Sequence, residues 1–243
     1  MLMDQYADAL QSVICQIRDT QREKILQAAQ IVSKTICEDG LIYVFGCGHS
    51  HLLAEETFYR AGGLACVQPI VNEPLMLHES ASRSGFLEKQ TGLAEEILAP
   101  YAFTSQDVLF VASTSGVNGV PVEVAAEAKR RGVTVLGIAS DAYLDIPPRN
   151  KHNAHLQQVC DLYIDNAVPQ GDACLQPRGL DIKMTPVSTV AGAYILHSIL
   201  AEATQLALDA GCKVPVYLSG NVPGGNQYNE QTIARYKSRI ACL

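Results

Sequence analysis

Two short segments rich in glycine and hydroxyl groups hold the residues best suited to chemistry. The first, from Gly46 to Ser50, reads Gly-Cys-Gly-His-Ser, and the second, from Ser113 to Gly116, reads Ser-Thr-Ser-Gly. Backbone N–H groups at the start of a helix bind anions, and hydroxyls add donors that need no positive charge. The two segments therefore predict a phosphate site. An ordinary helix cap is the alternative for the second, because Ser and Thr are good N-caps.

Each segment follows an apolar run that predicts a β-strand. The run at 41–45 is continuously apolar, and the run at 107–112 is apolar after Asp107, which is typical of strands covered on both faces of a parallel sheet. Further strands are predicted at 64–71, 133–139 and 162–164, with helices between them. This alternation predicts an α/β fold: a doubly wound five-stranded parallel sheet of order 2-1-3-4-5, flanked by helices.

The apolar periodicity also predicts the helices and loops around the sheet. A helical segment covers 1–39, with a break near 21–23. The other predicted helices cover 50–61, 86–98, 122–131, 185–210 and 230–239. Loops are predicted at 72–84, 140–156 and 166–183. We expect one domain over 1–243, with the N-terminal helical segment 1–39 and a C-terminal loop and helix extension over 213–243.

The composition limits which binding partners and which cellular location are expected. The net charge of −7 argues against general nucleic-acid binding, which depends on Lys and Arg. The sequence has no apolar stretch of about 18 residues without polar interruption, so no membrane span is predicted. The N-terminus lacks a basic segment followed by an apolar core, so a cytoplasmic location is predicted. The eight cysteines form no C-x-x-C pair and are predicted to be buried free thiols, with disulfides as the alternative.

The order of the strands brings the two segments together. In a sheet of order 2-1-3-4-5 the first and third strands are neighbours, and ligands bind beyond their carboxyl ends. Both segments are therefore expected to line one crevice. The first segment begins like the dinucleotide fingerprint G-x-G-x-x-G, but His51 stands where the third glycine belongs. A turn that presents Ser50 to a ligand is the preferred interpretation.

These motifs resemble a known family. Gly46-x-Gly48-x-Ser50 and Ser-Thr-Ser-Gly at 113–116, within this alternation, resemble the SIS (sugar isomerase) domain over about residues 30–210. The resemblance is closest to the branch of phosphoheptose isomerase and N-acetylmuramic acid 6-phosphate etherase. The tail at 219–225 is similar to that of a group of uncharacterised bacterial SIS proteins. The resemblance implies a three-layer sandwich, a sugar-phosphate ligand, and homodimers or homotetramers.

The resemblance also implies site residues. The residues expected to bind phosphate and sugar are Gly48, His49, Ser50, Ser113, Thr114, Ser115, Gly116 and Asn118. The isomerases have Asn-Ser where this chain has Val117-Asn118, and we expect the Asn118 amide to replace the lost hydroxyl as a donor.

The implied reaction is aldose–ketose isomerisation, which needs a base to move a proton between C1 and C2. Glu55 or Glu56 is expected to be that base, His197 the second acid or base, and Glu79 the second choice of base. The alternative for Glu55 and Glu56 is a solvated helix face or an interface ion pair, and the alternative for His197 is a core or interface histidine. A sugar-phosphate lyase of the etherase type and a non-catalytic phosphosugar sensor are the alternative functions.

No cofactor is predicted, and a zinc ion is the weaker option. His51 and Glu55 lie four residues apart on one helix face, and His197 could be a third ligand. Some phosphoheptose isomerases use zinc in this way, so the resemblance supports the same three residues.

Overall fold

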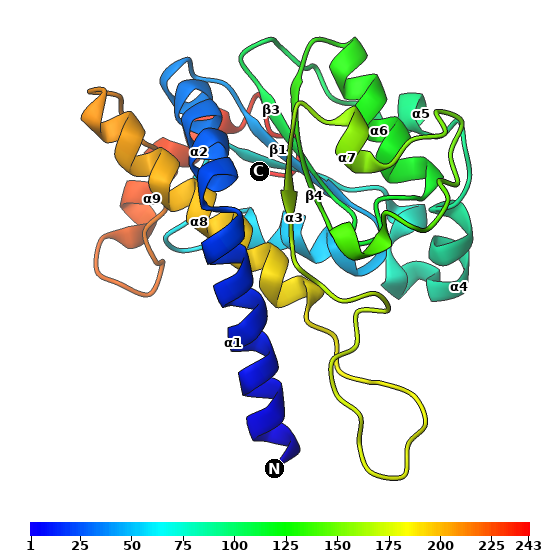
Figure 1. The fold of residues 1–243 in the computed structure, drawn as a ribbon. Coiled ribbons are helices and arrows are strands. Elements are labelled where there is room, and N and C mark those ends of the chain that lie inside the picture. Colours follow the sequence, from blue (N-terminus) through cyan, green and yellow to red (C-terminus); the bar gives the residue numbers. More distant parts are fainter.

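A computed structural model describes all 243 residues of the chain. Its five strands form one all-parallel sheet in the order β2-β1-β3-β4-β5, so the predicted topology is confirmed (Figure 1). The strands are β1 (Ile42–Gly46), β2 (Val67–Ile70), β3 (Val108–Ala112), β4 (Thr134–Ala139) and β5 (Leu162–Asp165).

The two central strands end at the same level. Gly46, the last residue of β1, lies opposite Ala112, the last residue of β3. Every residue of both strands is buried, as their continuous apolar runs predicted. The segments that follow β1 and β3 therefore leave the sheet side by side at its carboxyl edge.

Helices α2 (Arg22–Cys37), α3 (Leu52–Thr57) and α8 (Ser188–Asp209) cover one face of the sheet, and α1 (Leu2–Thr20) packs on α2 and α8 (Figure 1). Gln21 separates α1 from α2, so the predicted break near 21–23 is confirmed. Eight residues of the Ala-rich α8 are buried, and Gly211 follows its end with a φ of +79°. No helix combines the length and the apolar character needed to cross a membrane.

The opposite face is covered by α5 (Ala94–Leu98), α6 (Gly119–Arg130) and α7 (Leu156–Val159), with α4 (Leu77–Leu87) beside them (Figure 1). The predicted loop at 72–84 and helix at 86–98 are wrong here, because α4 begins at Leu77 and a turn separates it from α5. Gly92 in that turn has a φ of +88° and donates its N–H to Glu123 Oε2 at 2.7 Å. A buried carboxylate on α6 therefore fixes the break.

Boundaries of the other helices also differ from the sequence predictions; α6 begins at Gly119 rather than 122, and α8 begins at Ser188 rather than 185. A short 3₁₀ turn over Gly48–His51 precedes α3, which ends at Thr57 rather than near 61 because Phe58 is extended and Tyr59 has a φ of +45°. The last helix, α9 (Gly225–Tyr236), begins before the predicted position 230.

A disulfide joins Cys37 to Cys212, so the prediction of free thiols is wrong for these two residues. Cys37 ends α2 and Cys212 lies just after α8, and these two helices pack side by side. Their Cα atoms are 5.4 Å apart, within the range that a disulfide spans. The other six cysteines are free, but only Cys47 and Cys66 are buried, and the prediction of burial is wrong for Cys242, which is exposed.

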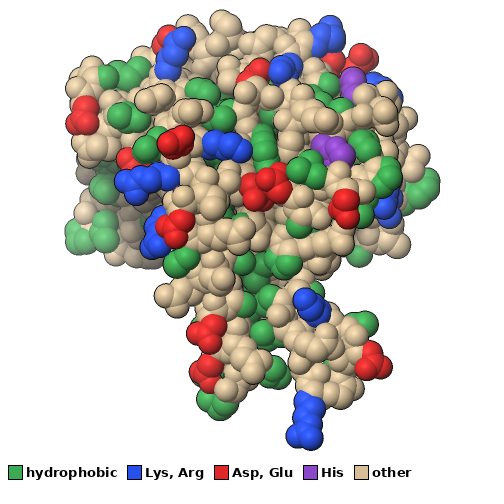
Figure 2. Space-filling view, viewed as in Figure 1, with side chains coloured by type: hydrophobic (Ala, Val, Ile, Leu, Met, Phe, Trp, Pro, Cys, Tyr) green, Lys and Arg blue, Asp and Glu red, His purple; other side chains and the backbone are tan.

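Two parts of the chain project from the body next to each other. They are the start of α1 and the segment 172–187, the two lobes at the bottom of the view (Figures 1 and 2). The Tyr6 hydroxyl donates to the Pro186 carbonyl at 3.1 Å and joins them. Both lobes carry exposed apolar side chains, including Met3 and Ile182.

Glu127 on α6 gives the fold an acid-sensitive contact. Its side chain is 8 % exposed and accepts hydrogen bonds from Arg130 Nε and Arg131 Nε, each at 2.7 Å. The hydrogen bonds from Arg130 and then Arg131 lower the pKa of Glu127 to about 2. Arg131 also donates to the Leu98 carbonyl at 2.7 Å, which ties α6 to α5.

We expect Glu127→Gln to be less stable than the wild type at pH 7. The pKa of Glu127 is lower in the folded chain than in the unfolded chain. Its ionised form therefore stabilises the fold above about pH 4.5, and this contribution is lost as the pH falls toward 2. Urea unfolding at several pH values measures the difference. A difference between variant and wild type that stayed constant from pH 7 to pH 2.5 would contradict the assignment.

Candidate functional site

The segments that follow β1 and β3 line one hollow of about 300 Å³ at the carboxyl edge of the sheet. Gly48 has a φ of +54°, which turns the chain after β1 into the 3₁₀ turn. Six of the residues expected to bind phosphate lie in its wall: Gly48, His49, Ser50, Ser113, Thr114 and Ser115. The crevice expected from the strand order is therefore present.

The segment after β3 offers free hydrogen-bond donors to this hollow. The backbone N–H groups of Thr114 and Ser115 donate no hydrogen bond within the chain. Ser113 Oγ accepts the Gly116 N–H at 3.3 Å, and Gly116 has a φ of +63°. That positive φ favours glycine, and a Cβ at Gly116 would also lie 2.8 Å from Gln157 Oε1, so a larger residue would strain the backbone and displace the Gln157 side chain. The site can therefore bind an anion through neutral donors.

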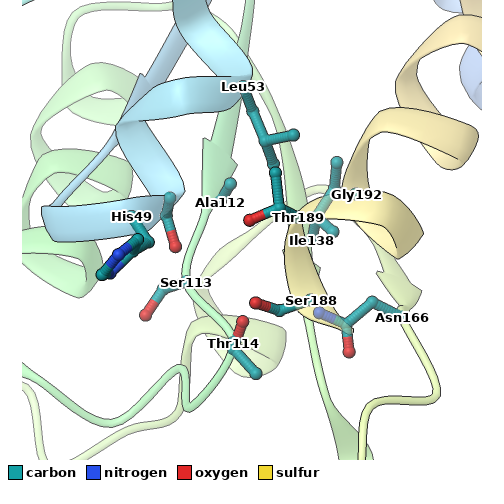
Figure 3. A pocket seen from close by; sticks show the side chains of 11 residues that line it. His49, Leu53, Ala112, Ser113, Thr114, Ile138, Asn166, Ser188, Thr189 and Gly192 are labelled. Atoms are coloured by element: carbon teal, nitrogen blue, oxygen red, sulfur yellow. The ribbon is translucent and has the colours of Figure 1, made fainter. Parts of the chain in front are cut away.

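The N-terminus of α8 forms a further wall, which the sequence analysis missed. Asp172 Oδ1 accepts the N–H groups of Val187 at 3.0 Å and Ser188 at 2.9 Å, and Asp172 Oδ2 accepts the Ser188 hydroxyl at 2.5 Å. The Ser188 hydroxyl faces that of Thr114 across a narrow space of about 10 Å³ (Figure 3). The paired hydroxyls of Ser188-Thr189 at the start of a predicted helix were the signal that could have located this wall.

Glu88 is the second residue that the sequence analysis missed. It lines the hollow, and Asp172 is the only other carboxylate there. Glu88 Oε1 accepts a hydrogen bond from Asn118 Nδ2 at 2.8 Å, whereas Oε2 makes none within the chain. The Glu88 carbonyl accepts the Val120 N–H at 3.0 Å, and a Cβ at Gly119 would lie 2.0 Å from the Gln90 carbonyl. The close contact with α6 fixes Glu88 and leaves one carboxylate oxygen free.

Asn118 lies outside the lining of the hollow. Its amide group donates to Glu88, and its Oδ1 atom is buried without a partner. The structure thus places the Asn118 amide against Glu88 and outside the hollow, so the expectation that this amide donates to the ligand is wrong. Asn118 therefore orients the Glu88 carboxylate and does not itself line the hollow.

The catalytic candidates Glu55, Glu56 and His197 lie in a neighbouring hollow. This second space is open, measures about 670 Å³ and shares Thr189 with the narrow space beside the hydroxyls. His197 Nε2 lies 3.0 Å from Glu56 Oε1, and Glu56 also pairs with Arg60. The glutamates and the histidine are therefore adjacent to the hydroxyl-lined hollow but not in its wall.

Glu79 and the zinc option are placed differently from the expectation. Glu79 is exposed and lines neither hollow, and its Oε1 lies 3.9 Å from His78 Nε2. His51 Nε2 contacts Glu55 Oε1 at 3.0 Å, whereas His197 contacts Glu56. The three residues of the zinc option are not assembled, and no group of three His, Cys, Asp or Glu side chains could hold a metal ion.

Cys47 also lines the hollow but is unsuited to nucleophilic chemistry. Burial raises the pKa of the Cys47 thiol well above its ordinary value, and the negative charge of Glu88 raises it further. Only the thiolate is a nucleophile, so the protonated thiol is inert at neutral pH.

Comparison with known families identifies the fold. Residues 5–140, more than half of the chain, match the SIS domain family model. The chain belongs to the SIS domain family. Its two hydroxyl-bearing loops and its five-stranded sheet are thus those of a SIS domain, and the resemblance noted in the sequence is confirmed.

Relatives of this SIS domain align along its whole length. A UPF0309 protein from Geobacillus thermodenitrificans is 42 % identical over 243 residues, which cover all of this chain and 98 % of the relative. A UPF0309 protein from Halalkalibacterium halodurans is 43 % identical, over all of this chain and 97 % of the relative.

Some solved structures are similar to this chain at low sequence identity. A putative phosphosugar isomerase from Silicibacter pomeroyi is 13 % identical, with a TM-score of 0.50, over 84 % of this chain and 50 % of that one. Phosphoheptose isomerase from Neisseria gonorrhoeae is 17 % identical, with a TM-score of 0.49, over 85 % of this chain and 99 % of that one.

Proposed function

We propose that this SIS domain binds a phosphorylated sugar, with the phosphate held by Ser50 and by the segment from Ser113 to Ser115. The observation that carries the proposal is the convergence of the two loops on one hollow, where the Thr114 and Ser115 amides are free. No Lys or Arg lines that hollow, so amide and hydroxyl dipoles are the donors that an anion would meet. Membership of the SIS domain family supports the same class of ligand.

The proposed reaction is aldose–ketose isomerisation. In that reaction a base removes the proton from C2 of the sugar and returns it to C1, while a proton moves from the C2 hydroxyl to the C1 carbonyl oxygen. Glu88 is suited to the role of base because it lines the hollow and its Oε2 has no hydrogen-bond partner within the chain. The other carboxylate, Asp172, is held by three donors at the start of α8.

Glu55, Glu56 and His197 remain a second location for the base. A sugar anchored by its phosphate near Ser50 and extended past Thr189 would reach the Glu56–His197 pair. Elimination of a C3 substituent, as in the etherases, begins with the same loss of the C2 proton and is the alternative reaction. A non-catalytic sensor would need neither carboxylate.

We also propose a cytoplasmic location, because sugar phosphates are charged metabolites that membranes retain. Assembly into homodimers or homotetramers remains a proposal from the family resemblance. Light scattering of the purified chain measures the number of copies, and a monomer at micromolar concentration would contradict the proposal.

Thermal unfolding with a panel of hexose and amino-sugar phosphates tests the binding proposal. We expect at least one phosphorylated sugar to raise the melting temperature, because a ligand at 100 times its Kd stabilises the native state by about 2.7 kcal/mol. The free sugars should have no effect. The double variant Ser113→Ala, Ser115→Ala should lose the response, because two donors of the hollow are removed.

A control double variant, Ser12→Ala with Ser105→Ala, changes exposed serines away from the hollow and should keep the wild-type response. Equal shifts from free and phosphorylated sugars would contradict a phosphate site. A full response from the Ser113→Ala, Ser115→Ala variant would do the same.

A further inference from the structure

A separate cavity of about 330 Å³ lies at the opposite edge of the sheet, where β1 and β3 begin. Its size is at the lower end of the range of small-molecule sites, roughly 300–1,000 Å³. The proposed phosphosugar site shares no residue with it. The residues that matter for its chemistry are Leu41, Tyr43, Gln68, Tyr101, Asp107 and Arg239.

The Tyr43 hydroxyl is the first polar group that this cavity offers to a ligand. Tyr43 is 2 % exposed, and its ring packs edge-on against Phe103 and Tyr101, with centroids 4.7 Å and 6.0 Å away. The hydroxyl makes no hydrogen bond within the chain, although its side chain lines the cavity. Unlike the Tyr217 hydroxyl, which is fully buried without a partner, the Tyr43 hydroxyl is accessible from the cavity, so it can donate a hydrogen bond to a molecule bound there.

Asp107 adds a carboxylate to the same wall. It is 3 % exposed and forms no ion pair. Its Oδ1 accepts the Leu41 N–H and its Oδ2 accepts the Thr104 N–H, both at 2.7 Å. Each carboxylate oxygen can accept a second hydrogen bond. The charge of Asp107 therefore favours a ligand that brings its own N–H donors.

The polar side chains at the rim of the cavity, Arg239 and Gln68, already have hydrogen-bond partners within the chain. Arg239 donates to the Asp39 carbonyl at 2.6 Å and pairs with the Asp39 carboxylate at 3.2 Å. The Gln68 amide accepts the Ala241 N–H at 3.2 Å and donates to the Pro69 carbonyl at 2.7 Å. These contacts fasten the C-terminal end of the chain over the cavity. They also leave no free cation for an anionic ligand.

We propose that this cavity binds a planar nitrogen heterocycle that carries an amino group next to a ring nitrogen. The ring lies against the aromatic side chains of Tyr43 and Tyr101. Its N–H groups donate to the Asp107 carboxylate, and a ring nitrogen accepts the Tyr43 hydroxyl. The proposal is independent of the phosphosugar site, because it uses other residues at the other edge of the sheet.

Binding of 2-aminobenzimidazole to the full chain, followed by NMR, tests this site, with 2-methylbenzimidazole as the matched probe that lacks the amino donor. We expect the methyl compound to bind at least about tenfold more weakly. Tyr43→Phe removes only the hydroxyl and should weaken binding of the amino compound about five- to tenfold, the effect of one hydrogen bond.

Tyr217→Phe is the matched control. Tyr217 is 3 % exposed with a buried hydroxyl that has no partner, but it lies outside the cavity, so binding should not change. In the wild type, nuclear Overhauser contacts should join the probe to the rings of Tyr43 and Tyr101, whatever the stability of the variants. Absence of those contacts, equal affinity for the two probes, or an unchanged affinity in Tyr43→Phe would overturn the proposal.

Discussion

Glu88→Gln is expected to slow proton exchange at C2 of a bound sugar phosphate by a factor of about 10² to 10⁴, the usual contribution of a general base. The amide keeps the size of the side chain and can still accept the Asn118 hydrogen bond at its oxygen. It cannot take a proton from carbon. The loss would therefore reflect chemistry rather than a change in fold.

Deuterium incorporation from D₂O, followed by NMR, measures this exchange for isomerisation and elimination alike. Glu55→Gln and Glu56→Gln test the second location for the base, because both glutamates line the neighbouring hollow. Glu88→Gln should retain the thermal response to the sugar phosphate, which shows that the site is intact. If Glu56→Gln alone abolished exchange, the base would belong beside His197. If no wild-type exchange occurred with any bound sugar phosphate, the sensor function would be favoured.

Reduction of the Cys37–Cys212 disulfide is expected to lower the free energy of unfolding by about 3 to 5 kcal/mol. The bond closes a loop with a sequence separation of 175 residues, and long loops restrict the unfolded chain most. The effect bears on the proposed location, because cytoplasmic reductants open most protein disulfides. Urea unfolding with and without a phosphine reductant measures it.

Two variants separate the disulfide from other effects of the reductant. Cys37→Ser with Cys212→Ser should unfold like the reduced wild type and should not respond to the reductant. Cys242→Ser changes an exposed free thiol and should behave like the wild type in both states. An unchanged unfolding midpoint in the reduced wild type would contradict the prediction.

The parts of the fold that the sequence predicted well depend on local patterns. The continuous apolar runs of β1 and β3 required burial on both faces, and this led to the parallel sheet and to the meeting of the two loops. The break between α1 and α2 and the glycine after α8 were also readable from neighbouring residues. Each of these signals lies within a few positions of the feature that it predicts.

The parts that the sequence did not reveal depend on contacts between distant residues. Glu88 was placed inside a helix because the contact of Gly92 with Glu123 on α6, which separates α4 from α5, has no local signal. The disulfide joins residues that only the packing of α2 on α8 brings together. Asp172 reaches the hollow because it binds the N–H groups that begin α8. The charge and size of a single side chain do not indicate which distant residues it will contact.

The packing of α8 on α1, α2 and α3 has a consequence for biosynthesis. All five strands precede α8 in the chain, so a ribosome releases the complete set of strands, with α2 and α3, before the helix that completes the cover of the same face of the sheet. Until then the nascent chain carries an uncovered apolar surface and lacks Ser188 in the wall of the proposed phosphosugar site. The vulnerable interval for aggregation is therefore late in translation, and chaperone protection matters most there.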